Sequence, residues 1–393
     1  MLVARRQRLR LFVLCVHLCL AFIAHRTLIV VCRDRPCNPL IERRFRKHVP
    51  TSILEQINDD RGRKAVQFLR TLPKKQMQPD YRKVDVTLAV ICTNRQENRY
   101  LTVSVAALLS ELARSPINVA PFICNVDAHP DQFAEAHKLS QFLPMLNVYQ
   151  RRQADPTMHV LAKEKLDYQL CLEEALSFRP HSDFVLLMED DAVVRKDFFS
   201  LLATVTRTLS LRQGVAFVKL YHPEDLRKVP WIPQIVSLSV GIGLISAYMW
   251  GRRLFCDCLT TVAVFLFQST LLCAFLFCLG HNNLSAWRLA ATGNVYLSEH
   301  ESCCTPAVLF PVGQIPAVLD YFRNATAGQK HAKDHIMDEI PSQLGLAGLA
   351  SDVDMVAHIG LVSSLRSWNE KEVYLRELEL SLLGAQFLGQ PFD

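Results

Sequence analysis

Two long apolar runs lie close together in the middle of the sequence, and they constrain the fold more than any other feature. Residues 232–250 are apolar apart from one glutamine and a few serines, and the one strongly polar side chain in residues 258–279 is Gln268. Neither run has a polar face, which suits lipid better than a half-exposed position in a soluble protein. Trp231 and Trp250 flank the first run, as interfacial aromatic residues do. A pair of buried core helices is the alternative, and we expect a transmembrane hairpin.

A third apolar run, residues 11–31, follows a cluster of arginines near the N-terminus. It is long enough to cross a hydrocarbon core of about 30 Å at about 1.5 Å per residue. A cleaved signal peptide is the rival interpretation, but no small-residue cleavage site follows cleanly, so we expect an uncleaved anchor. If the arginines are cytosolic, the hairpin places Arg252 and Arg253 on the same side of the membrane. Residues 1–10 are then a cytosolic tail, and the large polar segments face the lumen of the secretory pathway.

In the lumen of the secretory pathway, sequons can be glycosylated and cysteines can form disulfides. Asn324 starts an N-glycosylation sequon in a polar stretch, whereas the sequon at Asn283 lies so near the membrane that we expect it to stay unused. Among 13 cysteines, the candidates for lumenal disulfides are Cys124, Cys171, Cys303 and Cys304. Their pairing cannot be deduced from the sequence. The net charge of +6 is mild and shows no basic and aromatic interleaving, so we expect no nucleic-acid partner.

Outside the membrane runs, apolar strands alternate with helical patterns. We expect strands at 84–92, 117–126, 183–188 and 215–220, and helices at 101–114, 131–142, 161–177 and 196–209, with Asp131 near a helix cap. After the hairpin, shorter strands are expected near 294–298, 307–310 and 353–365, and residues 32–83 have the character of a basic, partly helical stem. This alternation predicts an α/β fold with a mainly parallel sheet, whose ligands bind beyond the carboxyl ends of the strands.

Three consecutive carboxylates carry the strongest chemical signal. Glu189, Asp190 and Asp191 directly follow the apolar strand 184–188 and precede another apolar segment. Such a cluster is favourable only if a cation neutralises it or if water solvates it well. A hard divalent ion held by carboxylates and by a substrate diphosphate is the usual solution, and it takes up charge that develops on the leaving group. A solvated acidic turn is the plain alternative.

Several segments together resemble a known family. The phrase from Leu187 to Ala192 looks like the metal and nucleotide-sugar motif of GT-A-type glycosyltransferases. The similarity extends to Thr93-Asn94-Arg95 with Tyr100-Leu101, Asn125-Val126-Asp127, Asp167-Tyr168 with Cys171-Leu172, Lys219-Leu220-Tyr221-His222-Pro223, and His358-Ile359-Gly360 with Ser363-Ser364-Leu365. Together these segments resemble the GPI-N-acetylgalactosamine transferases, which are distantly similar to type IV N-acetylglucosaminyltransferases. The resemblance spans roughly residues 84–365.

The resemblance implies a GT-A-type α/β fold that a transmembrane hairpin interrupts. Residues 84–231 would form the donor-binding half, 232–279 the hairpin, and 280–393 the acceptor-side half. The implied activity is inverting transfer of N-acetylgalactosamine from UDP-GalNAc to the first mannose of a GPI glycan, with Mn²⁺ as the metal. GPI-anchored proteins would be the acceptors, and the enzyme would be a multi-pass protein of the Golgi membrane with a lumenal catalytic domain.

The site residues follow from strand ends and from the family motif. Asp191 is our first choice as metal ligand, with Glu189 beside it. A lone histidine in an apolar strand is more often a core residue than a ligand, but the resemblance implies a role for His358 beside the metal or the diphosphate. Glu189 and Asp190 are expected to face the ribose or the sugar. Thr93 and Arg95 end the first strand, where their donors could meet the uridine and its phosphates. Tyr168 either packs against the base or sugar or belongs to the core.

An inverting transfer also needs a carboxylate that accepts the proton of the attacking hydroxyl. The candidates after the hairpin are Asp334 first, then Asp338 and Glu339; as the alternative, each caps a helix or lies on a solvated face. Other classes of function also stay open at this point. They are an N-acetylglucosaminyltransferase that acts on N-glycans, a metal-dependent hydrolase of lipid-linked phosphate, and a non-catalytic GT-A-like binding domain in the lumen.

Overall fold

The computed structural model describes residues 2–34, 51–74, 84–95, 99–148, 158–223, 232–254, 258–328 and 331–360. The chain forms two compact units. One contains His48–Leu226 and Thr292–Asp393, and the other contains Met1–Lys47 and Arg227–Ala291. The first is a mixed α/β unit and the second is helical.

An eight-stranded sheet forms the centre of the α/β unit, in the order β3-β2-β1-β4-β8-β6-β9-β7. Its first part consists of parallel strands, which are β1 (Val86–Cys92), β2 (Val119–Asn125), β3 (Met145–Asn147) and β4 (Phe184–Glu189). Strand β8 (Ala307–Pro311) runs antiparallel to both β4 and β6 (Val215–Lys219). Strand β9 (Ala347–Ser351) is parallel to β6, and β7 (Leu297–Glu299) closes that edge. The parallel strands that carry the acidic triplet therefore lie next to strands from the end of the chain.

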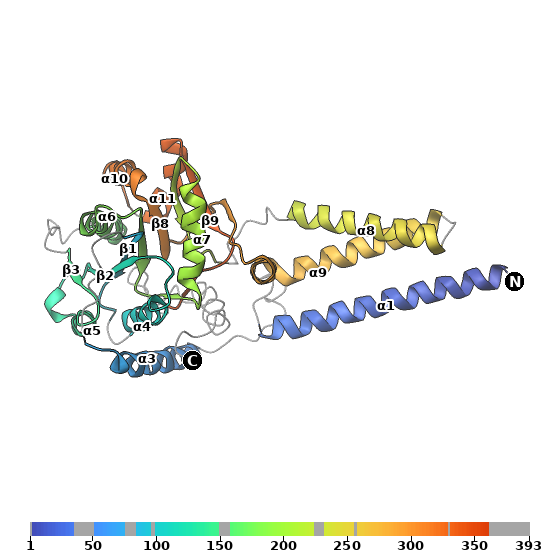
Figure 1. Ribbon diagram of the computed structural model, residues 1–393, viewed down its shortest axis with the longest axis horizontal. Coiled ribbons are helices and arrows are strands. Elements are labelled where there is room, and N and C mark those ends of the chain that lie inside the picture. The colour runs from blue at the N-terminus through green and yellow to red at the C-terminus, as the bar shows by residue number, and fades with distance from the viewer. Residues whose placement is uncertain are drawn as a thin grey trace. The chain divides into compact units, whose positions relative to one another are not determined.

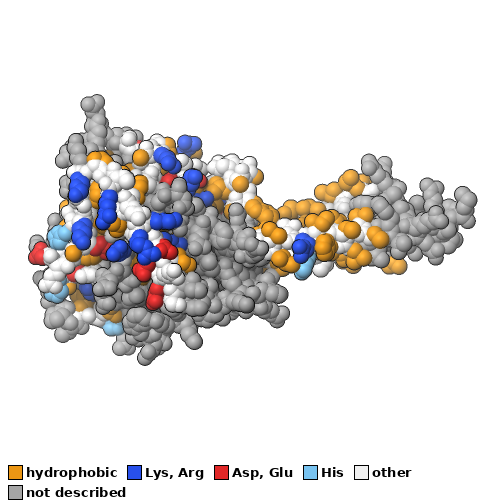
Figure 2. All heavy atoms as spheres, turned by 90° about the horizontal axis from the view of Figure 1, so that it is seen from below, with side chains coloured by type: hydrophobic (Ala, Val, Ile, Leu, Met, Phe, Trp, Pro, Cys, Tyr) orange, Lys and Arg blue, Asp and Glu red, His pale blue; other side chains and the backbone are white. Residues whose placement is uncertain are grey.

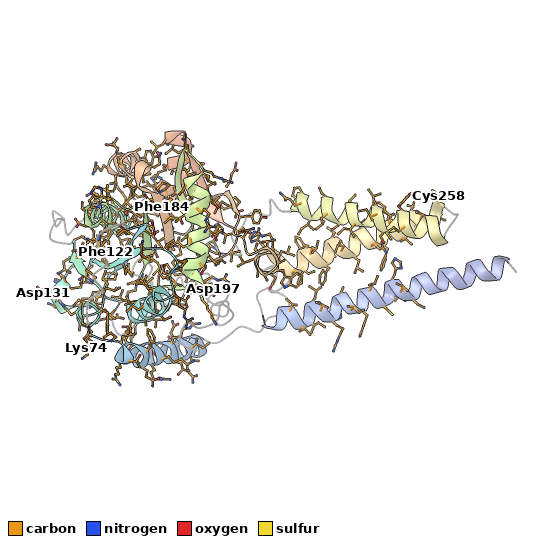
Figure 3. The ribbon with its side chains drawn as sticks, viewed as in Figure 1. Lys74, Phe122, Asp131, Phe184, Asp197 and Cys258 are labelled. Carbon is orange, nitrogen blue, oxygen red and sulfur yellow. A yellow bond between two sulfur atoms is a disulfide. The ribbon has the colours of Figure 1, made fainter. Side chains whose placement is uncertain are left out.

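Helices cover both faces of this sheet (Figure 1). Helices α6 (Val160–Phe178), α10 (Ile315–Asn324) and α11 (Lys333–Leu344) pack together over a core that includes Phe122, Phe217 and Phe310. On the other side, α4 (Tyr100–Leu112) contacts α5 (Ala134–Leu139), α7 (Phe198–Ser210) and α3 (Thr51–Thr71). Phe122 points into the packed interior (Figure 3). These layers fit the GT-A-type α/β fold that the sequence predicts.

Most of the predicted elements are present, with ends shifted by one to three residues. The helix predicted at 131–142 is confirmed only over Ala134–Leu139. A short 3₁₀ turn, Pro130–Gln132, is followed by the separate helix α5, because Phe133 has a non-helical backbone (φ −82°, ψ 75°) that turns its ring into the core. The expected stem contains α3, which packs on α4 within the α/β unit. Helices α10 and α11 lie in a polar segment after β8 for which no helix was predicted.

A disulfide links strand β2 to the covering helix α6. It joins Cys124 of β2 to Cys171 of α6, two of the four cysteines singled out in the sequence. The other two, Cys303 and Cys304, are adjacent, and the structure pairs their sulfur atoms. Both have positive φ angles of 96° and 58°, so the chain turns sharply just before β8.

The helical unit contains α1 (Leu2–Asp34), α8 (Ile232–Leu254) and α9 (Cys258–Thr292). One helical segment among the described residues, Thr261–His281, is long and apolar enough to cross a bilayer, whereas the apolar parts Cys15–Val31 and Pro233–Met249 are shorter. Large apolar side chains on all three helices are exposed. Gln268 of α9 lies 3.1 Å from Nε2 of His17 of α1. The predicted helices are therefore present, and the membrane crossing of all three stays a prediction.

Candidate functional site

The acidic triplet lies at the carboxyl end of β4, and a small second sheet brings a histidine to it. Strand β5 (Ala192–Val194) follows the triplet and pairs antiparallel with β10 (Val356–His358), so that His358 stands opposite Ala192. The backbone amide of Ile359 donates to the carbonyl of Asp191 at 2.9 Å. Two segments far apart in the sequence are thereby held together at the edge where α/β sheets bind ligands.

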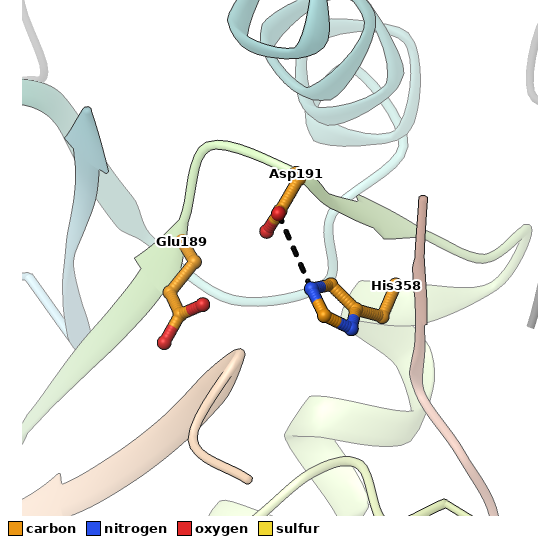
Figure 4. A group of neighbouring side chains, drawn as sticks. All are labelled: Glu189, Asp191 and His358. Carbon is orange, nitrogen blue, oxygen red and sulfur yellow. Dashed lines mark ion pairs between the residues drawn. The ribbon is translucent and has the colours of Figure 1, made fainter. Parts of the chain in front are cut away.

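Glu189, Asp191 and His358 form a group that matches the predicted metal ligands. One donor atom from each lies within 4.8 Å of the others (Figure 4). Nε2 of His358 is 3.2 Å from Oδ2 of Asp191. The other oxygen of Asp191, Oδ1, is buried and has no hydrogen-bond partner among the described residues. Two carboxylates and an imidazole, with one buried oxygen unused, fit a divalent transition metal.

A buried guanidinium neutralises the two aspartates. Nη2 of Arg95 lies 2.8 Å from Oδ1 of Asp190, and Nη1 lies 2.6 Å from Oδ2 of Asp191. Side-chain exposure is 12% for Arg95, 3% for Asp190 and 1% for Asp191, so the alternative of a solvated acidic turn is wrong for the two aspartates. The cation that the triplet requires is supplied, at least in part, by the protein itself.

The environment gives the two aspartates opposite protonation behaviour. Burial raises the pKa of Asp190 to about 7, against the opposing charge of Arg95 and with a further increase from Asp191. Burial also disfavours the charged form of Asp191, but the charges of Arg95 and His358 outweigh it and lower the pKa of Asp191. Burial lowers the pKa of His358, and the carboxylate of Asp191 outweighs it, so the net change is upward. Because a metal ligand must be deprotonated, Asp191 is the better ligand of the two aspartates.

Lys333 holds the third carboxylate. Its Nζ lies 2.7 Å from Oε1 of Glu189 and 2.6 Å from Oε1 of Glu164, with 9% of its side chain exposed. Burial alone would lower the pKa of Lys333, but the charges of Glu164 and Glu189 raise it well above the usual value. The ring of Tyr168 lies beneath the ammonium group at 5.5 Å. No sequence motif singles out Lys333, because its partner Glu189 lies 144 residues away in the sequence.

Of the three candidate bases, Asp334 is the one that shares a hydrogen-bonding partner with the acidic triplet. The hydroxyl of Thr305 donates to Oδ1 of Asp334 at 2.8 Å and lies 3.3 Å from Oε1 of Glu189. One threonine thus joins Asp334 to the triplet. Asp334 is half-buried in the first turn of α11.

Asp338 and Glu339 have other partners. Asp338 forms an ion pair at 2.6 Å with Lys219, whose side chain is fully buried and also donates to the carbonyls of Glu301 and Cys303. This pair fixes the turn before β8. Glu339 accepts from the hydroxyl of Tyr321 at 2.9 Å and lies 3.0 Å from Nε2 of His331. Both carboxylates therefore stabilise structure around α11.

Thr93 is engaged by carboxylates of the protein. Its hydroxyl donates to Oδ2 of Asp127 at 3.1 Å, and its amide donates to Asp190 at 3.4 Å. The amide of Asn94 also donates to Oδ2 of Asp127, at 2.7 Å. Asp127 thus orients the loop after β1, a role that only the family resemblance of Asn125-Val126-Asp127 signalled.

Tyr168 and Asn324, two further predicted residues, are not members of the metal-ligand group. Tyr168 is 2% exposed and its ring stacks on Phe322, which is the core position given as the alternative to a donor contact. Asn324 is exposed at the end of α10, as an accessible sequon requires, whereas Asn283 is buried. The motif Ser363-Ser364-Leu365 lies outside the described residues.

Residues 86–351 match the family model of the GPI-N-acetylgalactosamine transferase PGAP4, which is more than half of the chain. The chain belongs to this family. The match confirms the resemblance found in the sequence motifs and supports a general role as a glycosyltransferase of GPI anchors. It includes the triplet and Lys333, whereas His358 lies beyond its end.

Proposed function

We propose that this chain transfers N-acetylgalactosamine from UDP-GalNAc to the first mannose of a GPI glycan, with inversion at the anomeric carbon. Family membership supports the donor and the acceptor class. The observation that carries the chemistry is the convergence of Glu189, Asp191 and His358 within 4.8 Å at a strand end. Carboxylate ligands at the carboxyl end of a strand are suited to a divalent ion that binds a diphosphate.

Asp191, His358 and Glu189 would hold Mn²⁺, which neutralises the charge of the departing diphosphate when bound. Arg95 keeps Asp190 and Asp191 in fixed positions, since one planar guanidinium bridges both carboxylates. Lys333 likewise holds Glu189 in position, since its ammonium group contacts the carboxylates of both Glu189 and Glu164. The chain therefore pre-organises its carboxylates before any ligand arrives.

Asp334 is the general base of this proposal. Its carboxylate is held by Thr305 beside Glu189, and it would accept the proton of the acceptor hydroxyl as that oxygen attacks the sugar. Asp338 is less suited, because its ion pair with Lys219 already uses its charge. Glu339 lies on the same helix but contacts Tyr321 and His331 instead.

We further propose a multi-pass protein of the Golgi membrane whose α/β unit faces the lumen. Exposed apolar side chains on three helices support this, for example Leu18 at 58%, Leu244 at 55% and Leu266 at 55% exposure. A membrane-embedded enzyme meets a lipid-linked acceptor at a raised effective concentration. The hairpin, in this proposal, restricts the enzyme to the surface where GPI-anchored proteins lie.

The test uses the purified full-length chain in detergent with UDP-GalNAc, UDP-GlcNAc and UDP-galactose, each with a GPI glycan acceptor and with an N-glycan acceptor. We expect transfer from UDP-GalNAc to the GPI acceptor, dependence on Mn²⁺, and loss of transfer in Asp191→Asn. The exposed Asp131→Asn variant is the matched control and should retain transfer. Transfer of N-acetylglucosamine to the N-glycan would support the type IV alternative, and no turnover of any donor would support a binding domain.

A further inference from the structure

A cavity of about 580 Å³ lies between α3, α4 and α5 of the α/β unit, and none of its described lining residues belongs to the metal-ligand group. Its walls come from the second half of α3 and the segment after it, from the start of α4, and from α5 with the residues that follow. Leu69 and Phe142 form part of an apolar floor, and both are buried. A hollow of this size holds a small organic ligand.

Four cationic side chains surround this cavity. They are Arg70, Lys74, Arg99 and Lys138, all of which are exposed. In the described part of the chain, none of the four forms a hydrogen bond or a close ion pair through its side chain. Figure 2 shows Lys and Arg side chains gathered on the face where α3 lies, and Figure 3 shows Lys74 just beyond the end of that helix. Four like charges around one hollow create a positive potential there, which favours the binding of an anion.

The cavity contains one carboxylate among its described lining residues, and that carboxylate already has partners. Oε1 of Glu135 accepts from the amide of Thr102 at 2.8 Å and from its hydroxyl at 2.7 Å. Glu135 therefore satisfies the amino end of α4, a position that favours an anion. Burial raises the pKa of Glu135, while the Thr102 hydrogen bonds and the charges of Arg99 and Lys138 oppose that rise. One carboxylate leaves most of the positive charge unbalanced.

One residue of the cavity also lines a second, smaller hollow. Arg99 lines both this cavity and a small hollow beside Tyr100 and Ile359. Tyr100 lies under the guanidinium of Arg95 at 5.8 Å, and Ile359 directly follows His358.

We propose that this cavity binds the phosphate ester of a lipid headgroup and thereby positions the enzyme on its lipid-linked acceptor or on the surrounding bilayer. Arginine and lysine are the side chains that bind phosphate, and the apolar floor suits the organic group attached to it. The role of the phosphate in positioning the acceptor rests on the proposed function, whereas the binding itself does not.

The experiment measures binding to the full-length chain in a neutral detergent, with a chelator present so that metal-dependent donor binding does not contribute. The probes are inorganic phosphate, glycerophosphoinositol and dihexanoyl phosphatidylinositol, titrated by calorimetry. We expect the Arg70→Ser, Lys74→Ser, Lys138→Ser triple variant to bind at least tenfold more weakly than the wild type. The matched control, Lys196→Ser with Arg207→Ser and Arg212→Ser, removes the same charge from exposed positions on or near α7 and should bind as the wild type does.

The probes separate the sources of the phosphate. Tighter binding of dihexanoyl phosphatidylinositol than of glycerophosphoinositol assigns the cavity to a lipid in the bilayer, and equal binding of these two assigns it to the headgroup alone. Inorganic phosphate that binds as tightly as both would overturn the lipid assignment. Equal affinity of wild type and triple variant, or an equal loss in the control, would overturn the proposal. If the triple variant unfolds, Lys138→Glu alone must weaken binding, and UDP-sugar hydrolysis reports separately on the proposed function.

Discussion

Gly360 is the position where the smallest chemical change should have the largest effect on the site. A Cβ atom there would overlap Oδ2 of Asp191 and lie 2.9 Å from its Cγ, well inside the ordinary contact distance of 3.4 Å or more. Asp191 cannot swing aside freely, because Arg95 and His358 contact the same oxygen at 2.6 Å and 3.2 Å. We expect Gly360→Ala to displace the carboxylate by about 1 Å, which costs about 100-fold in kcat/KM.

The same overlap should cost only about 1–3 kcal/mol of folding free energy, as overpacking usually does. The assay compares kcat/KM for transfer, the Mn²⁺ concentration for half-maximal rate, and thermal unfolding. Gly313→Ala is the matched control, since a Cβ at Gly313 meets no atom within 4 Å. A folded Gly360→Ala enzyme with wild-type kcat/KM and wild-type Mn²⁺ dependence would show that the position of Asp191 does not limit catalysis.

Four further predictions concern the charged contacts of the site, the sequon and the membrane topology. Lys333→Met leaves the half-buried carboxylates of Glu164 and Glu189 without their shared cation and should lower the free energy of unfolding by about 3 kcal/mol in denaturant titrations. Adding Glu164→Gln should restore part of this stability, and full stability in the single variant would contradict the prediction. Arg95→Lys cannot bridge both aspartates and should lower kcat/KM at least tenfold without unfolding the chain, which thermal melting checks. Asn324→Gln should increase gel mobility by one glycan in secretory cells, and unchanged mobility would exclude use of this sequon. A tag inserted within residues 250–256 should be digested by protease outside sealed Golgi vesicles, whereas protection would exclude the proposed topology.

Local patterns predicted the sheet well because strand hydropathy is a property of neighbouring residues. The strand expected at 215–220 is observed as Val215–Lys219, and the one at 307–310 as Ala307–Pro311. The helix expected at 131–142 is shorter in the structure, because the buried ring of Phe133 accompanies a non-helical backbone there, and no local pattern shows which ring a core requires. The order of strands, with β8 between β4 and β6, has no local signature at all.

The site residues likewise divide into those with a local sequence pattern and those whose partners are distant in the sequence. The triplet could be recognised because its three carboxylates are adjacent, and His358 was chosen through the family resemblance. Lys333 and Thr305 could not be found, since their partner Glu189 is 144 and 116 residues away in the sequence. Arg95 was assigned to the donor phosphates, while the structure gives it two aspartate partners that only the pairing of distant strands brings within reach.

The position of β8 also dictates when this chain can fold during its synthesis. Strands β4 and β6 both precede the α8–α9 hairpin in the chain, yet β8, which lies between them, follows it. Until Ala307–Pro311 has left the ribosome, the sheet consists of two separate pieces with open strand edges, which are sites of aggregation. If α8 and α9 cross a membrane as proposed, a chain whose hairpin inserts wrongly would leave β8 on the other side and keep those edges open. In that proposed topology, correct insertion is a precondition for folding, and a failure would expose unpaired β-strand edges to quality control in the secretory pathway.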